Sequence, residues 1–290
     1  MPYVEVGKEN SGEIELYYND HGSGKPVVLI HGWPLNGASW EKQTLALLDA
    51  GHRVISYDRR GFGKSSRPTT GYDYDTFADD LHKLIGKLGL HDFTLVGFSM
   101  GGGEVARYVG KYGTKHMSGA VFVSAVPPFL LKTPDNPQGV DKGIFDGMKF
   151  AISQDRLAFL SKFLADFYNM DVLKGKGISD QVVQWSWNAA AVASPRGTID
   201  CITAFGETDF RKDLEKIDIP TLVIHGTEDR IVPFAISGKL TAQMVKGSKL
   251  VAIDGAPHGL IWTHADQANR ELLNFVAMAN KEEPAKVTAR

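Results

Sequence analysis

The regular alternation of short apolar runs with amphipathic stretches constrains the fold of this chain more than any other feature of its sequence. Runs such as PVVLIHG (26–32) are continuously apolar, which is typical of strands buried on both faces of a sheet. Between residues 74 and 88, Phe77, Leu81 and Ile85 recur with the spacing of one helical face. This alternation predicts βαβ units and a mostly parallel sheet. The predicted strands cover residues 14–18, 26–32, 53–58, 93–98, 120–126, 220–226 and 249–255.

The alternation stops between residues 128 and 217, where the chain has helical patterns and many aromatic side chains. Phe159, Phe163 and Phe167 are spaced four residues apart and share one helix face. Most of the aromatic residues here suit core packing. The sharper hypothesis is an inserted helical cap whose inner face lines an apolar pocket. We therefore predict a single α/β domain over residues 1–290, with residues 128–217 as the cap insertion.

Composition excludes several classes of protein. The net charge is −2 without a basic tract, which argues against nucleic acid as a partner. The single cysteine, Cys201, forms no intramolecular disulfide, and the stretch MPYVEVGKENSG lacks the apolar region of a signal peptide. The longest nearly apolar run, GAVFVSAVPPFLL, is too short to span a bilayer. We expect a cytoplasmic protein without membrane contact, with a loose charged tail from Lys281.

The stretch VGFSMGGGEVA (96–106) fits two patterns with different chemistries. GGGEVA matches G-x-G-x-x-A, which binds dinucleotide pyrophosphates, whereas GFSMG matches G-x-S-x-G, the sharp turn that presents a nucleophilic serine. A dinucleotide site also needs an acidic residue at the end of the next strand. That strand ends in Val126-Pro127-Pro128, which offers none. The sequence therefore favours Ser99 as a nucleophile at a strand-to-helix turn.

A serine nucleophile needs a base, and nine histidines compete for the role. His31 and His225 end predicted strands, so they face the correct edge of a parallel sheet. His258 follows the last predicted strand and matches the serine, acid, histidine order of this architecture. We predict His258 as the base, with His264 in reserve. Surface positions suit the remaining histidines, which are His21, His52, His82, His91 and His116.

The acid is expected on the loop after residues 220–226, which reads Thr227-Glu228-Asp229-Arg230. We predict Asp229, with Glu228 as the alternative. Asp254 is close to His258 in sequence, but it ends its own strand. A buried carboxylate at Nδ1 of the histidine would hold its tautomer and stabilise the imidazolium that forms.

An oxyanion hole needs two backbone N–H groups. One is expected from Met100, which follows the nucleophile. The other is expected from Trp33 in the loop His31-Gly32-Trp33-Pro34, because Pro34 has no N–H. No histidine and cysteine spacing resembles a zinc site, and we expect catalysis without a metal or other cofactor. The turn DRRGFG (58–63) carries charges that could bind an anion, but we favour a scaffold role.

Together these residues resemble the α/β-hydrolase superfamily. The segments HGWP, YDRRGFGKS, GFSMGGGE, SAVPPF, HGTEDRIVP and GAPHGL resemble a narrower group, the cofactor-free bacterial haloperoxidases and their arylesterase and perhydrolase relatives. The resemblance runs from Val4 to about Ala277. It implies an eight-stranded sheet flanked by helices, a helical cap, and a triad of Ser99, Asp229 and His258.

The resemblance also implies a substrate pocket, near Trp33, Pro34, Phe163, Phe167, Phe205, Ile231 and Phe234. Members of the group are usually homo-oligomers, often trimers. The group includes a γ-lactamase, so amide substrates stay open beside small carboxylic esters. The expected function is a serine esterase with perhydrolase side activity, and the alternative is an amidase or lactamase with the same triad. A non-catalytic receptor would show a damaged triad, and dehalogenases and epoxide hydrolases carry a carboxylate where this chain has Ser99.

Overall fold

The computed structural model describes residues 2–279 of the 290-residue chain, so the tail from Lys281 lies outside the described residues. In this part, eight strands form a sheet with the order β1-β2-β4-β3-β5-β6-β7-β8. The strands are β1 (Tyr3–Glu9), β2 (Gly12–His21), β3 (Pro26–Ile30), β4 (Arg53–Tyr57), β5 (Phe93–Phe98), β6 (Met117–Val123), β7 (Thr221–Gly226) and β8 (Lys249–Ile253).

Helices alternate with the strands from β3 to β6. The α-helices are α1 (Glu41–Asp49), α2 (Tyr74–Leu88), α3 (Met100–Tyr112), α4 (Lys142–Phe167), α5 (Met170–Leu173), α6 (Asp180–Ala191), α7 (Pro195–Glu207), α8 (Arg211–Leu214), α9 (Gly238–Met244), α10 (Leu260–Thr263) and α11 (Ala265–Ala279). Five of these helices, α4 to α8, lie between β6 and β7. Two short 3₁₀ helices are η1 (Gly37–Trp40) and η2 (Phe234–Ile236). The predicted helix over residues 74–88 has these same bounds; the side chain of Asp73 caps its first turn and Gly89, with φ 57°, ends it.

From β4 onward in the sheet order, neighbouring strands run parallel, while β1, β2 and β4 pair antiparallel. The prediction of a mostly parallel, eight-stranded α/β-hydrolase sheet is thus confirmed. The strand predicted at residues 14–18 is longer, because β2 pairs on both sides. Strand β1 was not predicted from the residues; its alternating Val4 and Val6 are buried.

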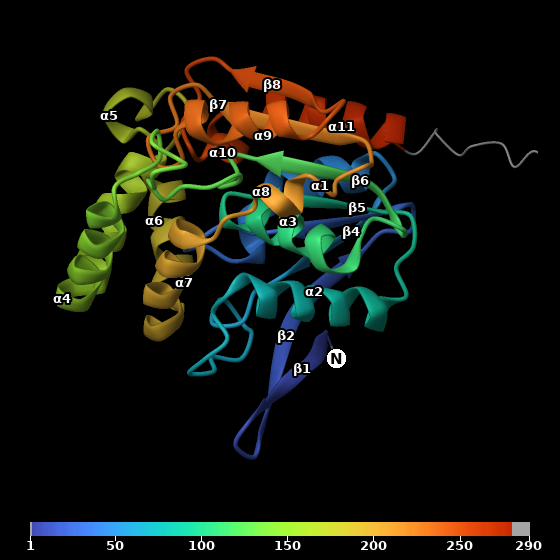
Figure 1. The fold of residues 1–290 in the computed structure, drawn as a ribbon, viewed down its shortest axis with the longest axis horizontal. Coiled ribbons are helices and arrows are strands. Elements are labelled where there is room, and N and C mark those ends of the chain that lie inside the picture. The colour runs from blue at the N-terminus through green and yellow to red at the C-terminus, as the bar shows by residue number, and fades with distance from the viewer. Residues whose placement is uncertain (1, 280–290) are drawn as a thin grey trace, which may run out of the picture.

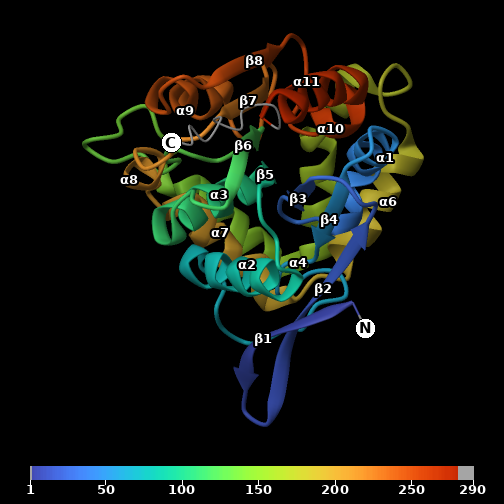
Figure 2. The ribbon, with the colours of Figure 1, turned by 90° about the vertical axis from the view of Figure 1, so that its right-hand side faces the viewer.

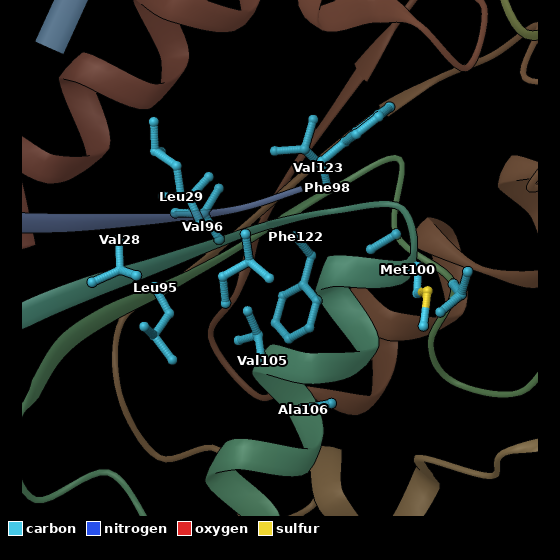
Figure 3. Packing of buried hydrophobic residues seen from close by; sticks show 14 of the residues in the cluster. Val28, Leu29, Leu95, Val96, Phe98, Met100, Val105, Ala106, Phe122 and Val123 are labelled. Atoms are coloured by element: carbon cyan, nitrogen blue, oxygen red, sulfur yellow. The ribbon is translucent and has the colours of Figure 1, made fainter. Parts of the chain in front are cut away.

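Helices cover both faces of the sheet. Figure 2 shows α2, α3 and α9 on one side and α1 and α11 on the other. The core lies between these layers. Figure 3 shows one part of it, where Phe122 of β6 points toward Val105 of α3, and both side chains are fully buried. This packing fixes α3 against the strands whose ends carry the candidate site.

The region predicted as a cap, residues 128–217, contains α4 to α8. We call α4, α5, α6 and α7 the helical layer. Figure 1 shows this layer beyond the edge of the sheet toward which the parallel strands point. Helix α4 is kinked at Asp155, whose φ and ψ of −152° and 93° are not helical. No helix in residues 2–279 combines the length and apolar character needed to cross a membrane.

Candidate active site

Ser99 occupies the sharp turn from β5 into α3. Its φ of 55° and ψ of −119° are unusual for a residue with a side chain, and such strain concentrates at functional sites. Glycines make the turn possible, because a Cβ on Gly97 would lie 2.4 Å from the carbonyl oxygen of Gly101. A Cβ on Gly101 would lie 2.3 Å from the carbonyl oxygen of Ile30. The turn therefore requires small residues on both sides of Ser99, as the G-x-S-x-G pattern supplies.

Three side chains predicted as a triad lie in one hydrogen-bonded chain. The Nε2 atom of His258 is 2.9 Å from Oγ of Ser99, and its Nδ1 atom is 2.7 Å from Oδ2 of Asp229. Asp229 follows β7 and His258 follows β8, so parallel strands bring both residues to the edge where β5 ends. An ionised carboxylate only accepts, so Nδ1 of His258 donates and Nε2 can accept the hydroxyl proton of Ser99. This is the geometry of a nucleophile with its general base.

The carboxylate of Asp229 is buried, and both of its oxygens accept hydrogen bonds. Its Oδ1 atom accepts hydrogen bonds from the backbone N–H groups of Ile231 (2.9 Å) and Val232 (2.8 Å). Burial raises the pKa of Asp229, but the charge of His258 and hydrogen bonds from His225 and His258 outweigh it and hold the pKa well below its usual range. Asp229 is therefore a carboxylate at neutral pH.

The alternative acids are placed differently. The side chain of Glu228 is exposed, and its backbone carbonyl accepts a hydrogen bond from Asn169 at 2.9 Å. Asp254 is also exposed and accepts from the hydroxyl of Thr227 at 3.4 Å. Neither carboxylate contacts His258, so only Asp229 among these three candidates can orient its ring.

His225 is a neighbour of the triad that sequence reasoning did not assign. Its Nε2 atom lies 2.9 Å from the carbonyl oxygen of Val232 and 3.3 Å from Oδ2 of Asp229. Because a carbonyl only accepts, Nε2 carries the proton and faces the carboxylate as a second donor. Its Nδ1 atom is buried without a hydrogen-bond partner in the described residues. The sequence signal that could have indicated this contact is the position of His225 at the end of a strand, four residues before Asp229.

The backbone loop after β3 lies directly against Ser99. A Cβ on Gly32 would be 2.8 Å from Cβ of Ser99, so only glycine permits this approach. The next residue is Trp33, whose N–H was predicted as one oxyanion donor. Met100, the other predicted donor, is the first residue of α3 and has no helical partner for its N–H. Its carbonyl accepts a hydrogen bond from the hydroxyl of Tyr74 at 3.0 Å.

A second buried polar cluster lies behind this loop and consists of His31, Tyr57, Arg59 and Glu104. Arg59 pairs with Glu104 at 2.8 Å and donates to the carbonyl of His31 at 3.0 Å. The ring of His31 accepts from the backbone N–H of Arg59 at 2.9 Å and lies 2.9 Å from the carbonyl of Gly32. We call this group the sealed cluster, because all of its side chains are buried and none lines the cavity described below.

The rest of the turn DRRGFG is also engaged within the protein. Asp58 accepts from the backbone N–H groups of Gly37 and Lys64, both at 2.8 Å. Arg60 pairs with Asp80 at 2.6 and 2.7 Å. These contacts leave the charges of the turn paired or hydrogen-bonded, which fits the scaffold hypothesis better than anion binding.

Six of the other histidines are more exposed than His258. The reserve base His264 is half-buried, its Nδ1 atom lies 2.9 Å from the hydroxyl of Thr263, and burial lowers its pKa. Of the five predicted surface histidines, His52 is half-buried. The other four are exposed, namely His21, His82, His91 and His116. Among the nine histidines, His258 alone is hydrogen-bonded to Ser99 in the described residues.

A cavity of about 690 Å³ opens at Ser99 beneath the helical layer. Of the predicted pocket residues, four line it: Trp33, Phe163, Phe205 and Ile231. Phe167 and Phe234 do not line the cavity. The ring centroid of Phe167 lies 4.8 Å from that of His258, and the ring centroid of Phe234 lies 5.7 Å from that of His225. Pro34 is buried and is not among the lining residues. Within residues 2–279, no group of three or more His, Cys, Asp or Glu side chains is arranged to hold a metal ion.

A nucleophile elbow on a mostly parallel sheet, followed by an acid and a histidine on later loops, defines an α/β-hydrolase architecture. Comparison with known families agrees, since the model of the family described as alpha/beta hydrolase fold matches residues 25–265. The chain belongs to the α/β-hydrolase fold family.

Three relatives refine this relationship. A provisionally named non-heme chloroperoxidase of Synechocystis sp. is 58% identical, over 95% of this chain and 100% of its own. A bifunctional esterase/perhydrolase of Acinetobacter calcoaceticus is 40% identical, over 91% of this chain and 96% of its own. The crystal structure of a bromoperoxidase from Bacillus anthracis superposes with a TM-score of 0.91 at 54% identity, covering 95% of this chain and 99% of that one. The resemblance to the haloperoxidase and perhydrolase group is thereby confirmed.

Proposed function

We propose that the protein is a serine hydrolase that cleaves small carboxylic esters through an acyl-enzyme and that also forms peracids. The observation that carries this proposal is the hydrogen-bonded chain from Ser99 through His258 to Asp229 at the end of an apolar cavity. The names of the similar proteins, among them a bifunctional esterase/perhydrolase, support it.

In the first step, Oγ of Ser99 attacks the ester carbonyl while Nε2 of His258 takes the hydroxyl proton. Asp229 stabilises the imidazolium through Nδ1. The N–H groups of Trp33 and Met100 stabilise the negative oxygen of the tetrahedral intermediate. His258 then gives its proton to the leaving alcohol, and the acyl group remains bound to Ser99.

In the second step, water attacks the acyl-enzyme and releases the carboxylic acid, with His258 again as base. Hydrogen peroxide can replace water and then leaves as the peracid, while Ser99 regains its proton. A peracid oxidises bromide to hypobromous acid and becomes the carboxylate, so halide oxidation would occur in solution. This route needs no metal or redox group in the protein.

A substrate panel tests the proposal. Purified protein is assayed on p-nitrophenyl acetate, phenyl acetate and a γ-lactam, and a fluorescent organophosphonate is used to label the nucleophile. Ester turnover and labelling of Ser99 alone support the proposal, whereas lactam turnover without ester turnover would support the amidase alternative. Labelling of a different residue would refute the assignment of Ser99.

Halide oxidation has its own test. Bromination of monochlorodimedone with peroxide should require acetate or another carboxylic acid, because Ser99 must first form the acyl-enzyme from the acid, with loss of water, before peroxide releases the oxidising peracid. It should persist in the presence of a chelator. Equal bromination in a carboxylate-free buffer would exclude the peracid route. A cytoplasmic location and a homo-oligomeric state remain predictions, and light scattering of the purified protein measures the second.

A further inference from the structure

The cavity at Ser99 is much larger than a small ester requires. Its volume is about 690 Å³. A water molecule occupies about 30 Å³ in the liquid, and a methylene group is similar in size, so the cavity has room for on the order of twenty heavy atoms. An acetyl group would fill only a small part of it. The rest of the volume therefore requires an explanation from the residues that line it.

The part of the cavity next to Ser99 has a wall of aromatic carbon. Trp33, Phe163 and Phe205 are buried, and the ring centroids of Phe163 and Phe205 lie 4.9 and 5.5 Å from that of Trp33. The one polar atom of these rings, Nε1 of Trp33, already donates to the carbonyl of Thr198 at 3.1 Å. This wall offers a substrate apolar surface and no hydrogen bond.

The apolar wall continues from Phe205 to the first half of α4. The ring centroids of Phe145 and Phe205 are 6.4 Å apart, and Phe145, Met148 and Ile144 all line the cavity. Ile144 is 58% exposed, so this wall reaches the protein surface. A chain bound at Ser99 would meet carbon atoms from the reacting end to the rim.

Charged side chains that line the cavity are confined to its rim. Asp155, Lys162, Asp166 and Arg230 are exposed, and the Arg230 guanidinium bonds to Asp171 at 2.8 Å on the outside of the protein. The interior therefore lacks a charged partner for a charged substrate group. Burying such a group there would cost much more than burying a methylene chain gains.

We infer that the preferred substrates are esters with an apolar acyl chain of about six to ten carbons, which fills the cavity from Ser99 toward the first half of α4. This inference rests on the proposed function. The acyl group, rather than the alcohol, occupies the cavity because it stays bound to Ser99 through both steps. Its burial then stabilises both transition states, whereas the alcohol leaves after the first.

The acyl-length dependence of kcat/KM tests this inference. p-Nitrophenyl esters from acetyl to dodecanoyl keep the leaving group constant and are assayed below their critical micelle concentrations. We expect kcat/KM to rise about two- to fourfold with each methylene up to about octanoyl, because burial is favourable and ordering the chain offsets part of the gain. A parallel series of n-alkyl acetates varies the alcohol and should change little.

Two glycines of α4 provide a matched pair of variants. Gly147 lines the cavity and Gly143, one turn earlier, does not. A Cβ at either position would meet nothing within 4 Å, so both sites accept a side chain. Gly147→Phe should obstruct the outer cavity and lower kcat/KM for the octanoyl ester about tenfold or more, while acetyl turnover stays within about twofold. Gly143→Phe should leave both substrates unaffected.

The outcomes separate this inference from the function on which it rests. Ser99-dependent turnover that is highest for acetyl and falls with length overturns the inference and leaves the esterase intact. So does a rise confined to the alcohol series, or an octanoyl rate that Gly147→Phe does not lower. Absence of Ser99-dependent turnover across all esters would overturn the proposed function itself.

Discussion

Two buried histidine clusters lie on either side of the loop that follows β3, and they differ in what surrounds them. His258 and His31 are both fully buried, and each uses both ring nitrogens. The partner of Nε2 in His258 is the hydroxyl of Ser99, which lines the cavity. Both partners of His31 are buried backbone groups, the carbonyl of Gly32 and the N–H of Arg59. Burial and hydrogen bonding therefore do not distinguish His258, the proposed base, from His31; only the partner of His258 is accessible from the cavity.

This contrast predicts that changes in the triad reduce activity and spare stability, while changes in the sealed cluster do the reverse. The largest expected effect is that of Ser99→Ala. It should lower kcat for esters by about 10⁵- to 10⁶-fold, because the nucleophile and its base act as a unit. The melting temperature should not fall, since the removed hydroxyl sits at a strained turn and its loss leaves no cavity of note. Calorimetry and burst kinetics measure the two effects, and near-normal turnover in the folded variant would refute the mechanism.

The second-largest effect is expected for Asp229→Asn. It should lower kcat by about 10³- to 10⁴-fold, because an amide no longer fixes the tautomer of His258 or stabilises the imidazolium. The neighbouring Glu228→Gln changes an exposed carboxylate by the same atoms and serves as the control. It should alter kcat by less than about twofold. A crippling effect of Glu228→Gln with a mild one of Asp229→Asn would reverse the acid assignment.

The sealed cluster should show the opposite pattern in Glu104→Gln. This change leaves Arg59 buried without its carboxylate, which costs about 3–5 kcal/mol of unfolding free energy. Asp20→Asn is the control, because Asp20 pairs with Arg53 where both side chains are about a quarter exposed (25% and 28%). That pair should contribute at most about 1 kcal/mol.

Urea denaturation measures the stability of the Glu104→Gln variant, and phosphonate titration counts the molecules that remain active. The kcat of titrated molecules should fall less than about tenfold, since no side chain of the cluster lines the cavity at Ser99. A loss of kcat comparable with that of Asp229→Asn, in a variant of normal stability, would show that the sealed cluster acts in catalysis.

Much of this arrangement could be predicted from the sequence, because it depends on local pattern and chain order. Apolar runs, together with the partial alternation of residues 14–18, identified seven of the eight strands, and the order of Ser99, Asp229 and His258 followed the order of the strands. Strand β1 was missed because its short alternation, with glycine and charged residues nearby, is a weak local signal. The kink of α4 at Asp155 was not predicted, although Asp155 caps the second half of the helix locally, with its Oδ1 atom accepting from the backbone N–H of Ala158 at 2.9 Å.

The site was less predictable where contacts join distant elements. His31 and His225 were both placed at the correct edge of the sheet, but which backbone and side-chain groups they bond to depends on tertiary packing. The pocket illustrates the same limit. Phe163 and Phe167 are one helical turn apart, yet Phe163 lines the cavity and Phe167 packs against the ring of His258.

The smallest expected effect is a pH dependence of stability caused by His31. Burial and the positive charge of Arg59 lower the pKa of His31 well below its usual 6.5, although its hydrogen bond to Gly32 opposes this. Below about pH 6.5 the unfolded chain therefore binds a proton at this residue that the folded protein does not bind. Stability must then decrease as the pH falls.

The contribution of His31 is fully present above the unfolded pKa and is lost progressively below it, by about 1.4 kcal/mol for each pH unit. Urea denaturation at pH 7.5, 6.5, 5.8 and 5.0 measures the slope for the wild type and for His31→Gln, which removes the titrating ring. The variant should be less stable at pH 7.5 but should lose less stability toward pH 5, whereas His21→Gln, at an exposed histidine, should follow the wild type. Both ring nitrogens of His31 are hydrogen-bonded to backbone groups, so the folded protein should not protonate this ring. Parallel stability curves for the wild type and His31→Gln would contradict this prediction, because they would show that His31 binds a proton equally well in the folded and unfolded states.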